Sequence, residues 1–418
     1  MKQSLTGLIK NKTLHNISMV FVSQIGSKIL IALSLVIVLR YITQDEFGMI
    51  SLIQSLIVIG SGVFLQGLNF SFITKLAGAK SNIEEQKKFS ASNFYSTILI
   101  GIVLSICFYL VIMVKPEILK EYGRQNVYSL LIIAGILGTS LVNFITAYYQ
   151  GRELFRFSAA ITFLQALFII LSYLILIYLD LISLPAVLIV IAATPCMFFL
   201  FTAFMNRKVL LSSNFNFNIV KKEIYGSRYY ILYSSLLVIA SQLDILMMSR
   251  FFSFKDVGEY SVASKLYSFF IIGLASIHTV LLPKFSSLKS INEMKALLVK
   301  SMRFTVPAAF GLVIIVLLTS NWIIRIFAGS QYEEAQVPLI ILSVSAGFSL
   351  ILSPSANILF AVSKVRVLVL SGIMLLVVAF LCHTFITSRF GADGAAISTL
   401  ISYLTINGFL FLYVFKLN

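Results

Sequence analysis

The chain alternates between long apolar runs and short polar breaks. A run of about 20 apolar residues is long enough to cross the hydrocarbon core of a bilayer as an α-helix. Runs of this length lie near residues 17–39, 47–67, 93–114, 127–148, 159–179, 185–205, 229–249, 258–281, 304–324, 337–359, 367–387 and 394–415. The pattern therefore predicts an all-α polytopic membrane protein with twelve transmembrane helices.

One polar break returns after about half of the chain. The segment RYITQDEFGMIS at 40–51 lies between two apolar runs, and RFFSFKDVGEYS at 250–261 does so 210 positions later. Chance similarity of two loops is the alternative, but the gap-free match and its place in a six-plus-six pattern favour duplication. Because six crossings return the chain to its starting side, we expect two six-helix lobes, 1–210 and 211–418, related as a parallel repeat.

Composition and charge agree with a membrane protein. Apolar residues make up 59% of the chain and charged residues 11%, whereas a soluble domain has about 45–50% and 25%. The net charge is +16, and the predicted connections on one side hold most of the Lys and Arg. Basic loops stay in the cytoplasm, so both termini are expected there. We interpret the positive charge as a topology signal that also meets anionic lipid headgroups, and not as a nucleic-acid surface.

Two further features limit the possibilities. The stretch SLTGLIKNKTLHNIS at 4–18 suits a short helix in the cytoplasmic interface, and a frayed terminus is the alternative. The first apolar run lacks a signal-peptide cleavage site, so we expect it to remain as a helix.

The three cysteines lie far apart within apolar runs, which predicts no disulfide and no metal centre; they are Cys107, Cys196 and Cys382. No cofactor is expected.

Four short motifs occur in an order that resembles a known family. They are YITQDEFGMISL after the first helix, LLPKFSSL at 281–288, IFAGSQYEEA at 326–335 and RFGADGAAISTLIS at 389–402. Over essentially its whole length the chain resembles the polysaccharide-transport branch of the multidrug/oligosaccharidyl-lipid/polysaccharide (MOP) exporter superfamily, specifically the O-antigen flippases (Wzx type). The segment LDLISLPAVLIV, which should match the start of the last helix, departs from the pattern because it has no glycine.

The resemblance implies a fold and a function. The fold is two six-helix lobes around a central cleft. The function is movement of an undecaprenyl-pyrophosphate-type lipid-linked oligosaccharide outward across the bacterial inner membrane, with proton or sodium coupling and glycan polymerase machinery as candidate partners. Such a cleft needs cations for the pyrophosphate and hydrogen-bonding groups for the sugars.

Lys28 is the first candidate for contact with the pyrophosphate. It lies near the middle of the first predicted helix, where a cation costs roughly 2.5–3.5 kcal/mol or more and usually marks function. Gln24 and Ser27 are placed near its helical face by their spacing. The alternative is a structural lysine that binds carbonyls of a neighbouring helix.

Asp244 and Lys265 flank the second repeated break at similar depth, and two interpretations stay open. The charges can neutralise each other as a structural pair, which is how most charges inside membranes are accommodated. Alternatively, Asp244 with Gln242 forms a proton or cation site, and Lys265, which shares a polar face with Ser268, is a second phosphate contact.

Two helices carry polar stripes at helical spacing. The first comprises Thr139, Asn143, Thr146 and Gln150, and the second comprises Ser349, Ser353 and Asn357. Each stripe either binds a neighbouring helix or lines the cleft for sugar hydroxyls, and its presence in both halves favours the lining. Tyr148, Tyr149, Tyr230 and Tyr233, near the cytoplasmic ends of two predicted helices, are expected in the interfacial aromatic belt. Pro307 and Pro354 each fall inside a predicted helix and can loosen its backbone.

Other function classes compete with the flippase. A membrane enzyme such as a glycan polymerase needs converging acids, bases or metal ligands, which the short connections do not supply, so we expect no enzyme. A drug/cation antiporter of the same superfamily should favour acidic residues in its cavity, and Lys28 indicates an anionic cargo instead. A scaffold without transport is disfavoured by the charges inside the membrane.

Overall fold

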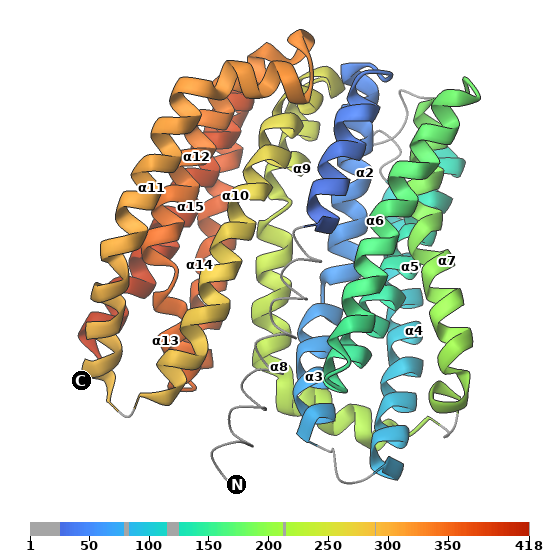
Figure 1. The fold of residues 1–418 in the computed structure, drawn as a ribbon, viewed down its shortest axis with the longest axis vertical. Coiled ribbons are helices and arrows are strands. Elements are labelled where there is room, and N and C mark those ends of the chain that lie inside the picture. Colours follow the sequence, from blue (N-terminus) through green and yellow to red (C-terminus); the bar gives the residue numbers. More distant parts are fainter. Residues whose placement is uncertain (1–25, 79–82, 115–124, 212–214, 289, 418) are drawn as a thin grey trace, which may run out of the picture. The chain divides into compact units, whose positions relative to one another are not determined.

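The structure is a computed structural model that describes residues 26–78, 83–114, 125–211, 215–288 and 290–417. Within these ranges every regular element is a helix, which confirms the all-α prediction (Figure 1). The first described helix is Gly26–Leu39. It is followed by α2 (Gln44–Gly62), α3 (Leu65–Gly78), α4 (Ile83–Val114), α5 (Gln125–Gly151), α6 (Phe155–Tyr178), α7 (Leu184–Leu210), α8 (Phe217–Ala240), α9 (Leu243–Phe251), α10 (Phe254–Ser287), α11 (Ile291–Phe327), α12 (Gln336–Leu352), α13 (Ser355–Ala361), α14 (Val365–Cys382) and α15 (Ser388–Lys416).

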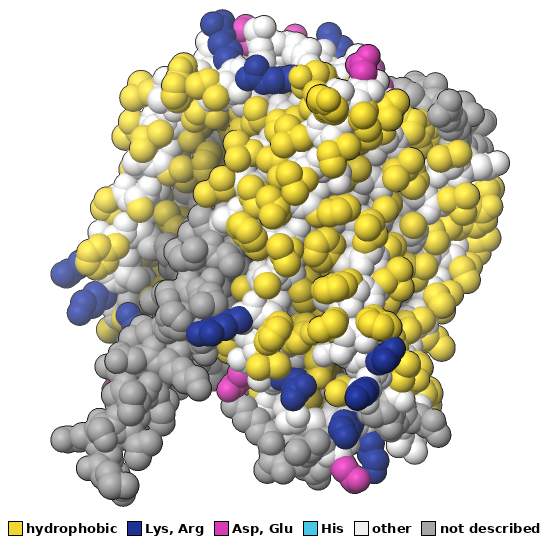
Figure 2. All heavy atoms as spheres, turned by 45° about the vertical axis from the view of Figure 1, so that its right-hand side comes forward, with side chains coloured by type: hydrophobic (Ala, Val, Ile, Leu, Met, Phe, Trp, Pro, Cys, Tyr) yellow, Lys and Arg dark blue, Asp and Glu magenta, His cyan; other side chains and the backbone are white. Residues whose placement is uncertain are grey.

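The helices have the length and surface of a multi-pass integral membrane protein. In the described ranges eight helices are long and apolar enough to cross a bilayer, and the count is nine if α2 and α3, bent by 45°, form one span. Figure 2 shows hydrophobic side chains covering the middle of one face, with Lys, Arg, Asp and Glu gathered toward its ends. The prediction of a polytopic membrane protein is confirmed, and the count of twelve crossings stays a prediction.

Three predicted runs are interrupted in the middle. The first break separates α2 from α3, the second lies at Ser241–Gln242 between α8 and α9, and the third lies at Ser353–Pro354 between α12 and α13. Proline removes a backbone donor and crowds the preceding turn, which accounts for the third break. Pro307, by contrast, lies inside the continuous helix α11.

The last two predicted helices are joined without an ordinary loop. A π-helical segment at His383–Thr387 links α14 to α15. Within α15 the chain turns at Gly391, whose φ of 56° and ψ of −132° suit glycine alone. The glycine-rich motif at 389–402 is therefore the site of this reversal.

The contacts of the chain group it into two compact units. The first comprises the residues up to 41 together with 56–231, and the second comprises 42–55 and 232–418. In the first unit α4 and α7 both pack on α5, and in the second α11 and α15 both pack on α12. The expected lobes, 1–210 and 211–418, stay a prediction.

The core of the first unit holds two tyrosines that were expected in the aromatic belt. Tyr148 and Tyr149 are buried. The Tyr148 hydroxyl accepts a hydrogen bond of 2.8 Å from Arg152 Nη1, and the Tyr149 hydroxyl accepts one of 2.6 Å from Asn206 Nδ2. Both rings therefore pack inside the protein, where polar partners satisfy their hydroxyl groups, and their place at the membrane interface stays a prediction.

The repeated sequence segments have the same local structure. Helix α2 starts at Gln44 and α10 starts at Phe254, 210 positions apart. The backbone N–H of Thr43 donates to Glu46 Oε2 at 2.9 Å, and that of Ser253 donates to Asp256 Oδ2 at 3.1 Å. In both cases the hydroxyl accepts from the backbone N–H of the acidic residue. Each copy thus begins its helix with a capping box, which explains the acidic residues in similar register.

The same two helix starts cross at a pair of glycines within the second unit. A Cβ atom on Gly48 would overlap the carbonyl oxygen of Phe254, and one on Gly258 would overlap that of Gln44. Gly48 and Gly258 are again 210 positions apart, so the contact is reciprocal. Glycine is required here because the two backbones approach too closely for any side chain.

Candidate transport site

The strongest polar cluster of the second unit surrounds Asp244. This residue lies in the first turn of α9, directly after the break that ends α8, and its side chain is buried. Its Oδ1 accepts a hydrogen bond of 2.8 Å from the backbone N–H of Ile245, and its Oδ2 accepts one of 2.8 Å from the Tyr260 hydroxyl. The start of a helix and a tyrosine donor both offset part of the cost of burying a negative charge at this position.

Further polar side chains of the second unit surround the carboxylate. Tyr260, which is fully buried in α10, also bonds Thr399 of α15. Tyr267 and Tyr403 interact electrostatically with Asp244. The break between α8 and α9 therefore places a carboxylate among hydroxyl groups from α10 and α15, an environment that can hold a proton or a small cation.

Lys265 belongs to this neighbourhood. Its ammonium group donates a hydrogen bond of 2.8 Å to Gln54 Oε1, and it interacts electrostatically with Asp244. The structure thus brings the two predicted charges into one cluster. Whether they act as a structural pair or as transport groups stays open. Gln242 is the N-cap residue of α9, where its side chain makes no capping hydrogen bond, and its amide donates to Ser241 Oγ at 3.3 Å.

In the first unit, Lys28 lies on the helix Gly26–Leu39. Its side chain is exposed, whereas the adjacent Ser27 is buried. Gln24 lies outside the described residues. The exposed Lys28 side chain is accessible to a ligand, as the hypothesis for the pyrophosphate requires. Ser27, which the helical spacing placed near the same face, is packed inside the protein instead.

The polar stripe on α5 divides into two parts. Asn143 is exposed, and Thr146 donates its hydroxyl to the Asn143 carbonyl at 2.8 Å within the helix. Gln150 instead donates to Ser158 Oγ of α6 at 3.1 Å. The Gln150 contact supports packing between helices, whereas Asn143 keeps its amide available for a ligand.

The second stripe does not lie on one straight helix. Ser349 belongs to α12, Ser353 follows its last residue, and Asn357 is buried in α13. Ser349 Oγ accepts a hydrogen bond of 3.2 Å from Asn407 Nδ2 of α15. This bond supports the packing interpretation for Ser349, and the break at Pro354 separates Ser349 and Ser353 from Asn357.

Sequence reasoning missed two buried glutamates. Glu259 follows the Gly258 crossing, accepts a hydrogen bond of 3.2 Å from Gln44 and lies 3.9 Å from the Lys255 ammonium group. Glu223 is buried near the start of α8 in the first unit. Glu259 lies in the repeated segment but aligns with Met49 at the offset of 210, so the repeat did not mark it. No sequence signal pointed to Glu223, which lies in a connection that was expected to be polar.

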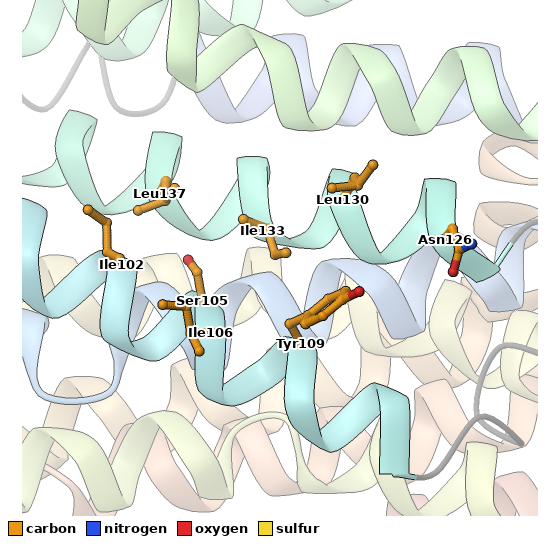
Figure 3. Close-up of a pocket in the computed structure, with 8 residues that line it drawn as sticks. All are labelled: Ile102, Ser105, Ile106, Tyr109, Asn126, Leu130, Ile133 and Leu137. Carbon is orange, nitrogen blue, oxygen red and sulfur yellow. The ribbon is translucent and has the colours of Figure 1, made fainter.

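An apolar groove lies elsewhere in the first unit, between α4 and α5. It has a volume of about 270 Å³, and Ser105, Tyr109 and Asn126 are its polar lining residues (Figure 3). The predicted transport residues do not line it. Its walls, formed by Ile102, Ile106 and Leu130 among others, belong to the exposed apolar surface.

The architecture is that of known transporters. Over 95% of this chain and 87% of the other, the fold matches the lipid II flippase MurJ in an inward closed conformation, with a TM-score of 0.75 and 17% identity. It matches an inward-facing multidrug resistance MATE family transporter of the MOP superfamily with a TM-score of 0.73 and 12% identity, over 93% of each chain. For the Vibrio cholerae MATE transporter VcmN the TM-score is 0.65 and the identity 13%, over 97% of this chain and 98% of the other.

These similarities show a shared fold, and the proteins that share it are transporters, not enzymes. No curated protein sequence matches the chain. A family match does come from the sequence itself, since residues 37–337 match the family described as "Polysaccharide biosynthesis protein". The matched segment covers more than half of the chain and includes both repeated breaks, so the chain belongs to the polysaccharide biosynthesis protein family and has the fold of the MOP transporters.

Proposed function

We propose that this protein is a flippase that moves a polyprenyl-pyrophosphate-linked oligosaccharide repeat unit from the cytoplasmic to the periplasmic leaflet of the bacterial inner membrane. The observation that carries the proposal is the combination of a polysaccharide biosynthesis family with the fold of a lipid II flippase. O-antigen and related surface glycans are the substrate class. Both termini lie in the cytoplasm in this proposal, in agreement with the distribution of basic residues.

The physical task assigns roles to the candidate residues. The polyprenyl tail can remain in the lipid, but the pyrophosphate and the sugars need a polar path. The exposed Lys28 ammonium group meets the pyrophosphate, and the exposed Asn143 amide bonds sugar hydroxyls. Asp244 binds the proton or cation that drives the cycle, because it is the buried carboxylate of the hydroxyl-rich cluster.

The test is complementation of a deletion strain with labelled lipid-linked intermediates. In the deletion strain, the polyprenyl-pyrophosphate-linked repeat unit should stay unmodified on the cytoplasmic leaflet. Expression of the unaltered protein should restore its export. Lys28→Ala should abolish export at normal expression, Lys28→Arg should retain part of it, and Lys208→Ala, at an exposed helix end, should behave as the parent does. Full export by Lys28→Ala would refute the role of Lys28, and absence of a trapped intermediate would refute the flippase.

A drug/cation antiporter is the second candidate, and the likeness to the MATE transporters favours it. An antiporter needs an acidic group for its organic cation, and Asp244 meets this requirement. Drug resistance and cation efflux measured in the same deletion strain separate the two functions, because a flippase of lipid-linked glycan leaves both unchanged.

A further inference from the structure

Glu223 in the first unit is a buried carboxylate outside the site described above. Only 1% of its surface is exposed, although it lies near the start of α8. Ser71 of α3 and Asn93 of α4 lie beside it. Three helices thus converge on one buried carboxyl group.

The groups around Glu223 present oxygen atoms and few donors. Both carboxylate oxygens of Glu223 and the amide oxygen of Asn93 are buried without a hydrogen bond of good geometry. The Asn93 amide nitrogen is already used, since it donates to the Phe89 carbonyl at 3.0 Å. Ser71 and Ser227 share a hydrogen bond of 2.5 Å with each other. Ser227 is the donor in that bond, so the Ser71 hydroxyl and the Asn93 amide are the donors beside Glu223. Neither makes a hydrogen bond of good geometry to the carboxylate, and three acceptor oxygens therefore lie unsatisfied at one buried position.

Lys75 on α3 is the charged group that acts on Glu223 from a neighbouring helix. Its influence is electrostatic, its side chain is exposed, and neither carboxylate oxygen of Glu223 has it as a hydrogen-bond partner. A carboxylate that is buried without a paired or hydrogen-bonding donor is strongly disfavoured. A proton or metal ion bound between the carboxylate and the amide oxygen removes this penalty.

We propose that Glu223 and Asn93 form a binding site for a small monovalent cation, Na⁺ or H⁺, in the first unit. Carboxylate and amide oxygens are the ligands that hard cations select, and Ser71 adds a hydroxyl oxygen. This site is separate from the Asp244 cluster, which belongs to the second unit, and it does not depend on the identity of the transported molecule.

The experiment uses the purified full-length chain carrying Asp244→Asn, so that the other carboxylate does not contribute. One arm measures binding of radioactive sodium and the rise of Tm with NaCl, with choline chloride as the reference salt. The other arm measures Tm against pH in choline chloride alone. Glu223→Gln keeps the side-chain volume, Asn93→Ser keeps an oxygen in case the first variant does not fold, and Glu84→Gln changes an exposed glutamate of α4 as a control.

For sodium as the ligand, we expect one bound ion per chain, a rise of Tm in NaCl, loss of both in Glu223→Gln, and at least tenfold weaker binding in Asn93→Ser. For a proton, the sodium arm is flat, and the pH dependence of Tm in the background chain shrinks in Glu223→Gln. Glu84→Gln should match the background in either case. If neither arm distinguishes the Glu223 and Asn93 variants from the Glu84→Gln control, the proposal is overturned. A finding that the protein does not export glycan would refute the proposed function but would leave the cation site unaffected.

Discussion

The Tyr260 hydroxyl donates a hydrogen bond of 2.8 Å to the Asp244 carboxylate, and both side chains are buried. Hydrogen bonds to charged groups contribute about 1.5–3 kcal/mol. We expect Tyr260→Phe to lower the free energy of unfolding by an amount in this range, because it removes the donor and keeps the ring. Thermal unfolding of the purified variant measures the change. Tyr178→Phe, at a side chain that is 87% exposed, should have no effect, and an unchanged Tm for Tyr260→Phe would show that the bond is not important for stability.

The neighbourhood of Asp244 and Lys265 permits a charge exchange. Each single reversal, Asp244→Lys or Lys265→Asp, should abolish export because it leaves two like charges in one buried cluster. If the two residues are a structural pair, the double exchange should restore export at normal expression. If Asp244 binds the coupling ion and Lys265 serves another step, export should stay lost although the double variant folds.

The close approach of the two backbones at Gly48 and Gly258 predicts that a glycine-to-alanine substitution there lowers the stability of the protein. Gly48→Ala and Gly258→Ala should each destabilise the protein by about 1–3 kcal/mol, because the added methyl group meets a backbone carbonyl that cannot move away easily. Gly311→Ala in α11 is the matched control, since no atom lies within 4 Å of its Cβ position. There the substitution should be neutral or stabilising, because alanine restricts the unfolded chain. Equal melting temperatures for all three variants would contradict the close approach.

The polar stripe on α5 predicts opposite effects for two of its members. Gln150→Ala should lower stability by about 0.6 kcal/mol, the average contribution of a hydrogen bond between membrane helices, and leave export per folded molecule unchanged. Asn143→Ala should leave Tm unchanged and reduce export, because its exposed amide has the role of a ligand. Measurement of Tm and of surface glycan for both variants decides the matter, and the reverse pattern would assign Gln150 to the transport path.

The helices were predictable because a bilayer leaves the backbone few alternatives. A run of apolar residues that spans hydrocarbon must bond its own backbone, so length and hydropathy identify the helix. The sequence could not tell the break at Pro354 from the continuous helix at Pro307, since both prolines lack the donor for the preceding turn. The break at Ser241–Gln242 was not visible, because these residues fit a helix and no glycine or proline marks the interruption.

The candidate site was predictable in part. The hairpin geometry predicted that Asp244 and Lys265 lie at equal depth, because they are at similar distances from a turn, and in the structure the two side chains interact electrostatically. Helical spacing could not tell whether Gln150 or Asn143 faces a neighbouring helix, since that depends on the partner helix. Glu223 escaped notice because a charge near a predicted connection normally meets water, and its burial results from packing against α3 and α4.

The glycine crossing has a consequence for the ancestry of the chain. A contact in which Gly48 and Gly258 play interchangeable parts is what two identical protomers form about a two-fold axis. A half-length ancestor could therefore have paired with a second copy of itself through this surface before the two genes fused. Under the duplication that the repeat predicts, the halves are free to differ: at the same offset of 210, Asp244 and Lys265 correspond to Ser34 and Ser55, and Lys28 corresponds to Val238. A homodimer would have had to carry each charge twice, whereas the fused protein carries each of them in one half.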